Sequence, residues 1–279
     1  MKTALLRRLA PFSILAVPLL VPVVASSGNA ASPTPAVAIP AAARGVAFGT
    51  SLGGDMASTI KLFPNARIGR VFESAPKAKL PALPSSYQIW LSFKTSPSLV
   101  ASGGFNTQFA ALLKAWNASG RTVYWTWQHE ADRHAGFSSA QFRAGWAQLL
   151  SVEKKYPSSK VHSMSILTGI VLAPNHPHGS PENWYVNADV LGFDCYVPAS
   201  VPRAMAYAKA KHKPWSIPEF GAHSGDTGNI AYINSTIASW AAYPPIGASW
   251  YNNTAAAGFS QPLRGLPKTT AYLRNLAAG

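Results

Sequence analysis

The sequence is poor in negative charge and almost free of cysteine. Only 10 of its 279 residues are Asp or Glu, against 24 Lys and Arg, so the position of each carboxylate is informative. The one cysteine, Cys195, excludes a disulfide within the chain. Because Cys195 lies in an apolar, strand-like segment, we expect a buried thiol without a chemical role.

Several motifs that indicate a particular chemistry are absent. His129 and His134 are five residues apart, whereas the zinc-binding helix motif needs a spacing of four. Basic residues are scattered and never form the run of five or six that is typical of a charged tail. We therefore expect no metal, no cofactor and no nucleic-acid partner.

Only one apolar run, at roughly residues 12–24, is long enough to concern a membrane, and two prolines interrupt it. It is too short to span a bilayer. Basic residues precede the run and small residues follow it, which is the layout of a secretory signal. We expect a signal peptide over residues 1–30, cleaved after Ala30, with an uncleaved N-terminal anchor as the alternative. Residues 31–43 are rich in Ala and Pro and are expected to form a linker.

The chain that remains after cleavage is strongly basic. Without the three basic residues of the signal, 21 Lys and Arg stand against 10 acidic residues, which is a net charge of +11. Such a surface attracts polyanions, and anionic cell-wall polymers are the polyanions expected outside a cell. The sequence thus predicts a secreted, extracellular protein with no membrane contact after signal cleavage.

Eight apolar, β-like runs follow the linker at regular spacing. They lie at residues 45–50, 67–73, 87–93, 122–129, 161–168, 190–197, 214–220 and 246–251. Helix-compatible stretches separate most of them, most clearly at 105–118, 139–155, 202–212 and 229–242. Strands that alternate with helices predict a parallel sheet. Eight such units in about 235 residues match a barrel, so we expect residues 44–279 to form an α/β fold, a (β/α)8 TIM barrel.

A doubly wound open sheet is the alternative fold. That fold usually has a glycine-rich, phosphate-binding turn after its first strand. Residues 50–55 read Thr-Ser-Leu-Gly-Gly-Asp, which does not fit that pattern. The barrel is therefore the preferred prediction.

Two glutamates stand where the fourth and seventh strands of such a barrel end. Glu130 follows the run 122–129, and Glu219 lies near the end of the run 214–220. Barrel active sites lie at the carboxyl ends of the strands, where strands four and seven face each other across the mouth. Two facing carboxyls are what glycosidic hydrolysis requires: one donates a proton to the leaving oxygen, and the other, ionised, attacks the anomeric carbon. The alternative is that each glutamate is a surface residue in a loop.

Three further side chains are candidates at this mouth. A hydrogen bond from the Tyr196 hydroxyl would favour an ionised Glu219, and so would the charge of Arg70 at the end of the second run. Trp250, near the end of the eighth run, has an indole face that suits the apolar face of a pyranose. The alternatives are a core tyrosine, a surface cation and a core tryptophan.

The pair resembles clan A of the glycoside hydrolases, in which the acid/base ends strand four and the nucleophile ends strand seven. His129-Glu130 is similar to glycoside hydrolase family 26, the β-mannanase-like family, which has His before the acid/base where most of the clan has Asn. Three other segments resemble the sixth, seventh and eighth strands of that family. They are Asp194-Cys195-Tyr196, Pro218-Glu219-Phe220-Gly221 and Ala248-Ser249-Trp250-Tyr251.

The resemblance, which covers residues 45 to about 275, implies a role for each residue. Glu130 would be the general acid/base and Glu219 the nucleophile. His129 would orient the acid/base or the sugar, Tyr196 would support the nucleophile, and Trp250 would form the floor of the sugar site. The residues after Glu130 are Ala-Asp-Arg, where family 26 mannanases commonly have Met-Asn-Gly. Mannan, xylan and mixed-linkage glucan therefore all stay open as substrates.

Together these features predict a secreted, retaining endo-β-glycanase that cleaves β-linked polysaccharide by a two-glutamate double displacement. Two other classes stay open: a catalytically inactive barrel that binds carbohydrate, and a metal-dependent polysaccharide deacetylase or hydrolase. The pair of glutamates argues against the first class, since a pure binding protein has no use for two facing acids. A chelator would expose the second.

Overall fold

Eight parallel strands close into a barrel in the order of the sequence, and β8 pairs with β1. In the computed structural model the strands are β1 Ala47–Ser51, β2 Ile68–Glu73, β3 Gln88–Phe93, β4 Val123–Trp127, β5 Val161–Thr168, β6 Val190–Asp194, β7 Trp215–Phe220 and β8 Gly247–Trp250. Each of the eight predicted strands overlaps an observed one. The predicted (β/α)8 fold is confirmed, and the open-sheet alternative is wrong because the sheet is closed.

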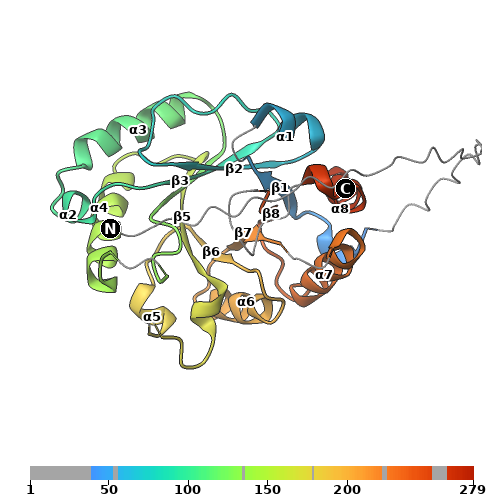
Figure 1. Cartoon of the computed structure of the whole chain (residues 1–279). Coiled ribbons are helices and arrows are strands. Elements are labelled where there is room, and N and C mark those ends of the chain that lie inside the picture. The colour runs from blue at the N-terminus through green and yellow to red at the C-terminus, as the bar shows by residue number, and fades with distance from the viewer. Residues whose placement is uncertain (1–38, 53–55, 134–135, 178, 222–224, 253–262) are drawn as a thin grey trace, which may run out of the picture. The chain divides into compact units, whose positions relative to one another are not determined.

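Helices follow most of the strands and surround the barrel (Figure 1). They are α1 Met56–Leu62, α2 Pro97–Ala101, α3 Asn106–Ala118, α4 Ser139–Glu153, α5 Pro181–Trp184, α6 Ser200–Ala210, α7 Gly225–Ser239 and α8 Pro267–Ala278. Short 3-10 helices lie at Ala41–Ala43, Gly169–Leu172 and Leu263–Gly265. The four predicted helices correspond to α3, α4, α6 and α7. Proline in the first turn begins α2, α5 and α8, a position where its missing N–H has no cost.

The structure describes residues 39–52, 56–133, 136–177, 179–221, 225–252 and 263–279. The expected signal peptide and residues 31–38 of the expected linker lie outside these ranges. Ala41–Ala43, at the end of that linker, form a 3-10 helix in which Ala43 is buried. The backbone oxygen of Ala42 accepts a hydrogen bond of 3.0 Å from Trp240 Nε1, so these residues pack on the barrel. Within the described ranges, no helix is long and apolar enough to cross a membrane.

The barrel interior is apolar near its base and becomes polar toward its mouth. The apolar layer consists of Ala47, Ile68, Trp90, Met164, Ile166 and Val190. Alternate residues of a strand share one face, so Arg70, Ser92 and Thr168 lie one layer closer to the carboxyl ends. All three are buried. The fold therefore gathers polar groups at the end of the barrel where active sites of this architecture lie.

Strand β7 carries one extra residue near its carboxyl end. Ile217 pairs with Ala248 and Phe220 pairs with Trp250, so three steps along β7 match two steps along β8. This irregularity is a β-bulge, which re-aims the side chains of the bulged strand. Pro218 lies within it, and a bulge is one of the few places where a sheet accepts proline. Ile217 and Phe220 both pack in the core outside the barrel, while the residue between Pro218 and Phe220 turns into the mouth.

Candidate active site

That residue, Glu219, is held by the buried Arg70 and the partly buried Tyr196. The Tyr196 hydroxyl donates a hydrogen bond of 2.6 Å to Glu219 Oε2, and Arg70 Nη2 lies 3.5 Å from Glu219 Oε1. Arg70 Nη1 donates a 2.6 Å hydrogen bond to Ser92 Oγ, which fixes the guanidinium. The side chains of Arg70 and Glu219 are 0% and 6% exposed. Both contacts that the sequence predicts for Glu219 are therefore present.

Burial raises the pKa of both glutamates, but different neighbouring groups offset that rise at each of them. Burial raises the pKa of Glu219 above its ordinary value, and the charge of Arg70, with hydrogen bonds from Tyr196 and Arg70, offsets part of that rise. Burial, followed by the negative charge of Glu219, raises the pKa of Glu130 to about 7. The cation and the phenol both contact Glu219, so negative charge is favoured there and the proton is favoured on Glu130. This is the division that a proton donor and an attacking carboxylate need.

Glu130 lies in a turn beyond β4, not at the strand end as the sequence suggested. The strand ends at Trp127, and both Gln128 and Glu130 have left-handed backbone, with φ of 54° and 53°. Such values are uncommon for residues other than glycine and cluster at functional sites. The Glu130 N–H donates a 2.9 Å hydrogen bond to the oxygen of Ile166 in β5. The turn is thus attached to the next strand at the residue that carries the carboxyl.

Trp127, the last residue of β4, is fixed by close packing against α4. A Cβ atom added at Gly145 would lie 2.4 Å from Trp127 Cη2, so only glycine allows this approach. Trp127 Nε1 and Gln128 Nε2 both donate hydrogen bonds to the oxygen of Thr95. The end of β4 is therefore held by α4 on one side and by the segment after β3 on the other.

Asp194, at the end of β6, adds a third carboxyl to the site. It is 3% exposed, and neither of its carboxyl oxygens has a hydrogen-bond partner among the described residues. Burial, and then the charges of Glu219 and Glu130, raise the pKa of Asp194 well above its ordinary value. Cys195 next to it is buried as predicted, and burial raises the pKa of its thiol to about 12.

The aromatic residue that reaches the site from β8 is Tyr251, and the expected role of Trp250 is not supported. Trp250 is fully buried and packs edge-on against Phe220 with 5.4 Å between ring centroids. Alternation along β8 explains this, because Trp250 belongs to the outer core together with Ala248. Tyr251 is half-buried, and its ring lies 5.9 Å from that of Tyr196.

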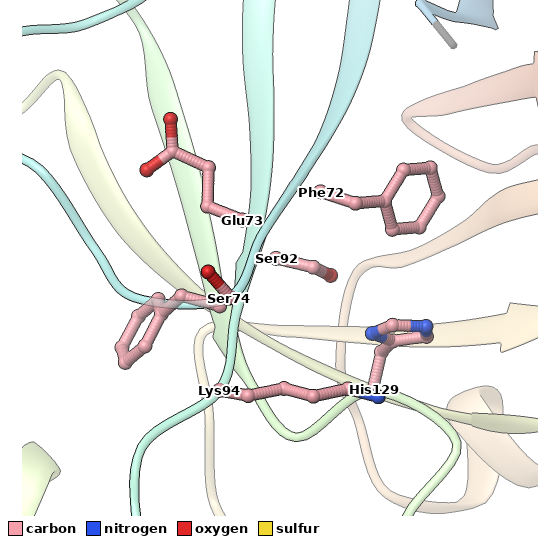
Figure 2. A pocket seen from close by; sticks show the side chains of 7 residues that line it. Phe72, Glu73, Ser74, Ser92, Lys94 and His129 are labelled. Atoms are coloured by element: carbon pink, nitrogen blue, oxygen red, sulfur yellow. The ribbon is translucent and has the colours of Figure 1, made fainter. Parts of the chain in front are cut away.

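His129 lines a pocket of about 270 Å³ beside the glutamates, at the carboxyl ends of β2 and β3. The other lining residues are Phe72, Glu73, Ser74, Ser92, Phe93 and Lys94. Figure 2 shows Phe72 and His129 on the same side of this pocket, with 5.3 Å between their ring centroids. The Arg70 guanidinium lies 4.4 Å from the Phe72 ring centroid. Two lining residues, Phe72 and Ser92, therefore also contact Arg70, the partner of Glu219.

The residues that sequence reasoning did not single out are Ser92, Phe72, Tyr251 and Asp132. Ser92 and Phe72 lie on the same strand face as Trp90 and Arg70 respectively, so alternation along β2 and β3 is the signal that would have found them. Asp132 is 1% exposed and contacts Thr168 in β5. Within the described residues, no group of three or more His, Cys, Asp or Glu is arranged to hold a metal ion; His134 lies outside those residues.

Comparison by sequence finds no matching family model and no matching curated protein. Comparison by structure finds the fold in several glycanases. A modular endo-β-1,4-mannanase of family 26 from Cellulomonas fimi has a TM-score of 0.55 at 13% identity, covering 82% of this chain and 70% of that chain. A family 26 β-mannanase from Bacteroides ovatus has a TM-score of 0.55 at 14% identity, with 85% and 89% covered.

A broad-specificity endoglucanase of family 5 from Clostridium longisporum is also similar. Its TM-score is 0.59 at 10% identity, with 85% of this chain and 97% of that chain covered. The fold of this chain is thus the (β/α)8 barrel that these glycanases also have. At these identities the likeness concerns the fold, so the chemistry has to be argued from the residues of this chain.

Proposed function

We propose that this protein is a retaining glycoside hydrolase in which Glu219 is the nucleophile and Glu130 the general acid/base. The observation that carries the proposal is the unequal support of the two carboxyls. Glu219 contacts both Arg70 and Tyr196, whereas the pKa of Glu130 is raised to about 7 by burial and by the charge of Glu219. Within this site, negative charge is thus favoured on Glu219 and the proton on Glu130.

The reaction then proceeds in two displacements. In the first, a carboxylate oxygen of Glu219 bonds to the anomeric carbon, the glycosidic C–O bond breaks, and the Glu130 proton goes to the leaving oxygen. In the second, a water molecule gives a proton to Glu130 and attacks the anomeric carbon, which releases Glu219. Direct attack leaves no room for water between the carboxyls, so we expect them about 5–5.5 Å apart in a crystal structure. A separation of about 8 Å would indicate inversion.

The substrates to test first are β-linked neutral polysaccharides. The structures that share the fold include endo-β-1,4-mannanases and a broad-specificity endoglucanase. The pocket formed by Phe72, Lys94 and His129 extends the site beyond the two glutamates, which suits endo-acting cleavage of a polymer. Mannan, xylan and mixed-linkage glucan are the panel that this reasoning supports.

The experiment that tests the proposal compares Glu219→Ala and Glu130→Ala with the wild type on this panel. Glu219→Ala should abolish formation of the glycosyl-enzyme. Glu130→Ala should impair substrates with poor leaving groups far more than activated aryl glycosides, because only the former need a proton. Azide should partly restore Glu130→Ala by attacking the intermediate. Equal losses on both substrate types, or no effect of azide on either variant, would contradict the assignment.

Saturating chelator separates this proposal from a metal-dependent deacetylase or hydrolase. Two carboxylates and water complete the reaction, so release of reducing ends should be unchanged after treatment with EDTA. Loss of activity that added Zn²⁺ restores would favour the metal-dependent class. Binding of glycans without any release of reducing ends by the wild type would favour an inactive carbohydrate-binding barrel.

We also propose that the protein is secreted and that its positive charge retains it on anionic cell-wall polymer. The proposal depends on the basic and apolar segments of residues 1–30 and on the excess of Lys and Arg in the remaining chain. Protein recovered from the culture medium should begin near Ala31 and should bind a cation exchanger. Recovery of protein that still begins at Met1 would contradict cleavage.

A further inference from the structure

The turn that carries Glu130 is attached to β5 at two points. The Glu130 N–H donates to the oxygen of Ile166 over 2.9 Å. Two residues further along, Asp132 Oδ1 accepts a 2.9 Å hydrogen bond from the N–H of Thr168, and Asp132 Oδ2 accepts another from Thr168 Oγ1. Ile166 and Thr168 are alternate residues of one strand. The turn therefore lies along β5, and residues two apart in the turn contact residues two apart in the strand.

The second of these attachments is a buried side chain at an unusual position. Asp132 is 1% exposed and Ala131 beside it is also 1% exposed, so the turn beyond Glu130 enters the core, where a surface loop would stay in solvent. Burial of a carboxylate is costly unless it is hydrogen-bonded. Thr168 supplies both hydrogen bonds. The hydrogen bonds between the buried Asp132 carboxylate and Thr168 thus restrict the conformations open to the left-handed Glu130 backbone.

We propose that Asp132 is a positioning residue for the acid/base: it holds the Glu130 carboxyl over the scissile bond through Thr168. This inference rests on the proposed role of Glu130. Asp132 does not contact Glu219, and it acts on the reaction only through the turn and through its charge.

The charge of Asp132 gives the inference a second, independent consequence. Asp132 is among the groups that raise the pKa of Glu130, after burial and the charge of Glu219, while Arg133 and Arg70 lower it. Loss of the Asp132 charge should therefore lower the pKa of Glu130. The proton donor would then lose its proton at lower pH, and the basic limb of the kcat/KM profile should move to lower pH.

Three variants separate the hydrogen bonds from the charge. Asp132→Ala removes both hydrogen bonds and the charge. Asp132→Asn is nearly isosteric, keeps an acceptor for the Thr168 N–H and removes the charge. Thr168→Val keeps the charge and the backbone hydrogen bond and removes only the hydroxyl contact.

The measurement is kcat/KM against pH on two substrates, one with a poor alkyl or sugar leaving group and one activated aryl glycoside. Asp132→Ala should lose about 100-fold on the first, which is the size of effect that a misplacement of 1 Å produces, and much less on the second. Thr168→Val should show the same preference with a smaller loss and an unmoved basic limb. Asp132→Asn should move the basic limb to lower pH.

Asp189→Asn is the matched control. Asp189 Oδ2 accepts a 3.1 Å hydrogen bond from the N–H of Ser163, and the Asp189 N–H donates to Ser163 Oγ, at the opposite end of the same strand. Asp189→Asn therefore disturbs β5 without touching the turn, and the ratio between the two substrates should stay at the wild-type value. Equal losses on both substrates in Asp132→Ala and Thr168→Val, or an unmoved basic limb in Asp132→Asn, would overturn the inference.

Failure of the proposed function would look different. In that case the wild type would hydrolyse neither substrate. Titration of the Glu130 carboxyl by ¹³C NMR, in wild type and in Asp132→Asn, still tests the inference then, because it needs no turnover. A lower midpoint in Asp132→Asn supports it, and an unchanged midpoint contradicts it.

Discussion

Replacement of Tyr196 by Phe tests whether its hydroxyl favours the ionised form of Glu219, the proposed nucleophile. The Tyr196 hydroxyl donates the shortest hydrogen bond that Glu219 receives among the described residues, at 2.6 Å. Burial, followed by the charge of Glu219, raises the pKa of Tyr196 itself, so the phenol keeps its proton and serves only as a donor. Tyr196→Phe removes that donor and leaves the ring, with its edge-on contact to Tyr251, in place.

The size of the effect follows from the strength of that hydrogen bond. A hydrogen bond to a charged group contributes about 1.5–3 kcal/mol, and about 1.36 kcal/mol corresponds to one pH unit of pKa. The bond stabilises the ionised form of Glu219, so its loss should raise the pKa of Glu219 by roughly 1–2. The acidic limb of the kcat/KM profile should then move upward by about the same amount. The basic limb, set by Glu130, should stay in place because Glu219 is still charged at high pH.

The assay is kcat/KM on a soluble β-linked oligosaccharide between about pH 4 and 9. Tyr243→Phe is the control, since its hydroxyl donates a 2.9 Å hydrogen bond to the oxygen of Lys213 just before β7. That variant loses a hydroxyl that contacts the amino end of β7, whereas Glu219 lies near its carboxyl end. It should keep the wild-type pH profile. A uniform fall of Tyr196→Phe at all pH values, with both limbs unmoved, would refute the reasoning.

Further predictions concern the base of the barrel and the end of β8. Burial, and then a neighbouring carboxylate, raise the pKa of Glu153 to about 7. The folded state therefore disfavours the ionised form of Glu153. The free energy of unfolding should fall as pH rises from about 4.5 through 7, by roughly 3 kcal/mol at most. Glu153→Gln keeps an acceptor for Trp125 Nε1. Urea unfolding of this variant at pH 5 and 8 should show no such fall in the free energy of unfolding. A fall as large as in the wild type would show that Glu153 is not its cause. Trp250→Ala, which opens a cavity beside Phe220, should cost about 3–5 kcal/mol of stability. Tyr251→Ala should instead lower kcat/KM with a small change in the urea midpoint, and the reverse pattern would show that the two aromatics had been assigned to the wrong faces.

The fold was predictable because its signal is repeated. Eight apolar runs with helical spacers are enough to indicate a closed parallel barrel, and an error of two or three residues at a strand end does not change that conclusion. The shorter helices gave a weaker signal. Neither α1 nor α2 contains a full amphipathic pattern, because they have only 7 and 5 residues.

The side chains of the site were less predictable because they depend on single-residue register. Trp250 and Tyr251 are neighbours in the sequence, and alternation alone decides which of them faces the mouth. The turn after Trp127 places Glu130 three residues beyond the end of β4, and no sequence pattern indicates its left-handed backbone. Asp132 appeared only as a departure from a family motif. Its contact with Thr168 depends on how the turn docks on β5, which lies beyond local sequence.

The bulge in β7 links the stability of the core to the position of Glu219, the proposed nucleophile. Glu219 and Phe220 are consecutive residues, yet one belongs to the site and the other to the outer core. If the extra residue were absorbed, regular alternation would shift by one position and carry a carboxylate toward the apolar layer between strands and helices, at a cost of several kcal/mol. A register that packs the core wrongly would therefore also displace Glu219, the proposed nucleophile. Molecules that pack this strand correctly have, by the same packing, the Glu219 carboxyl at the mouth of the barrel.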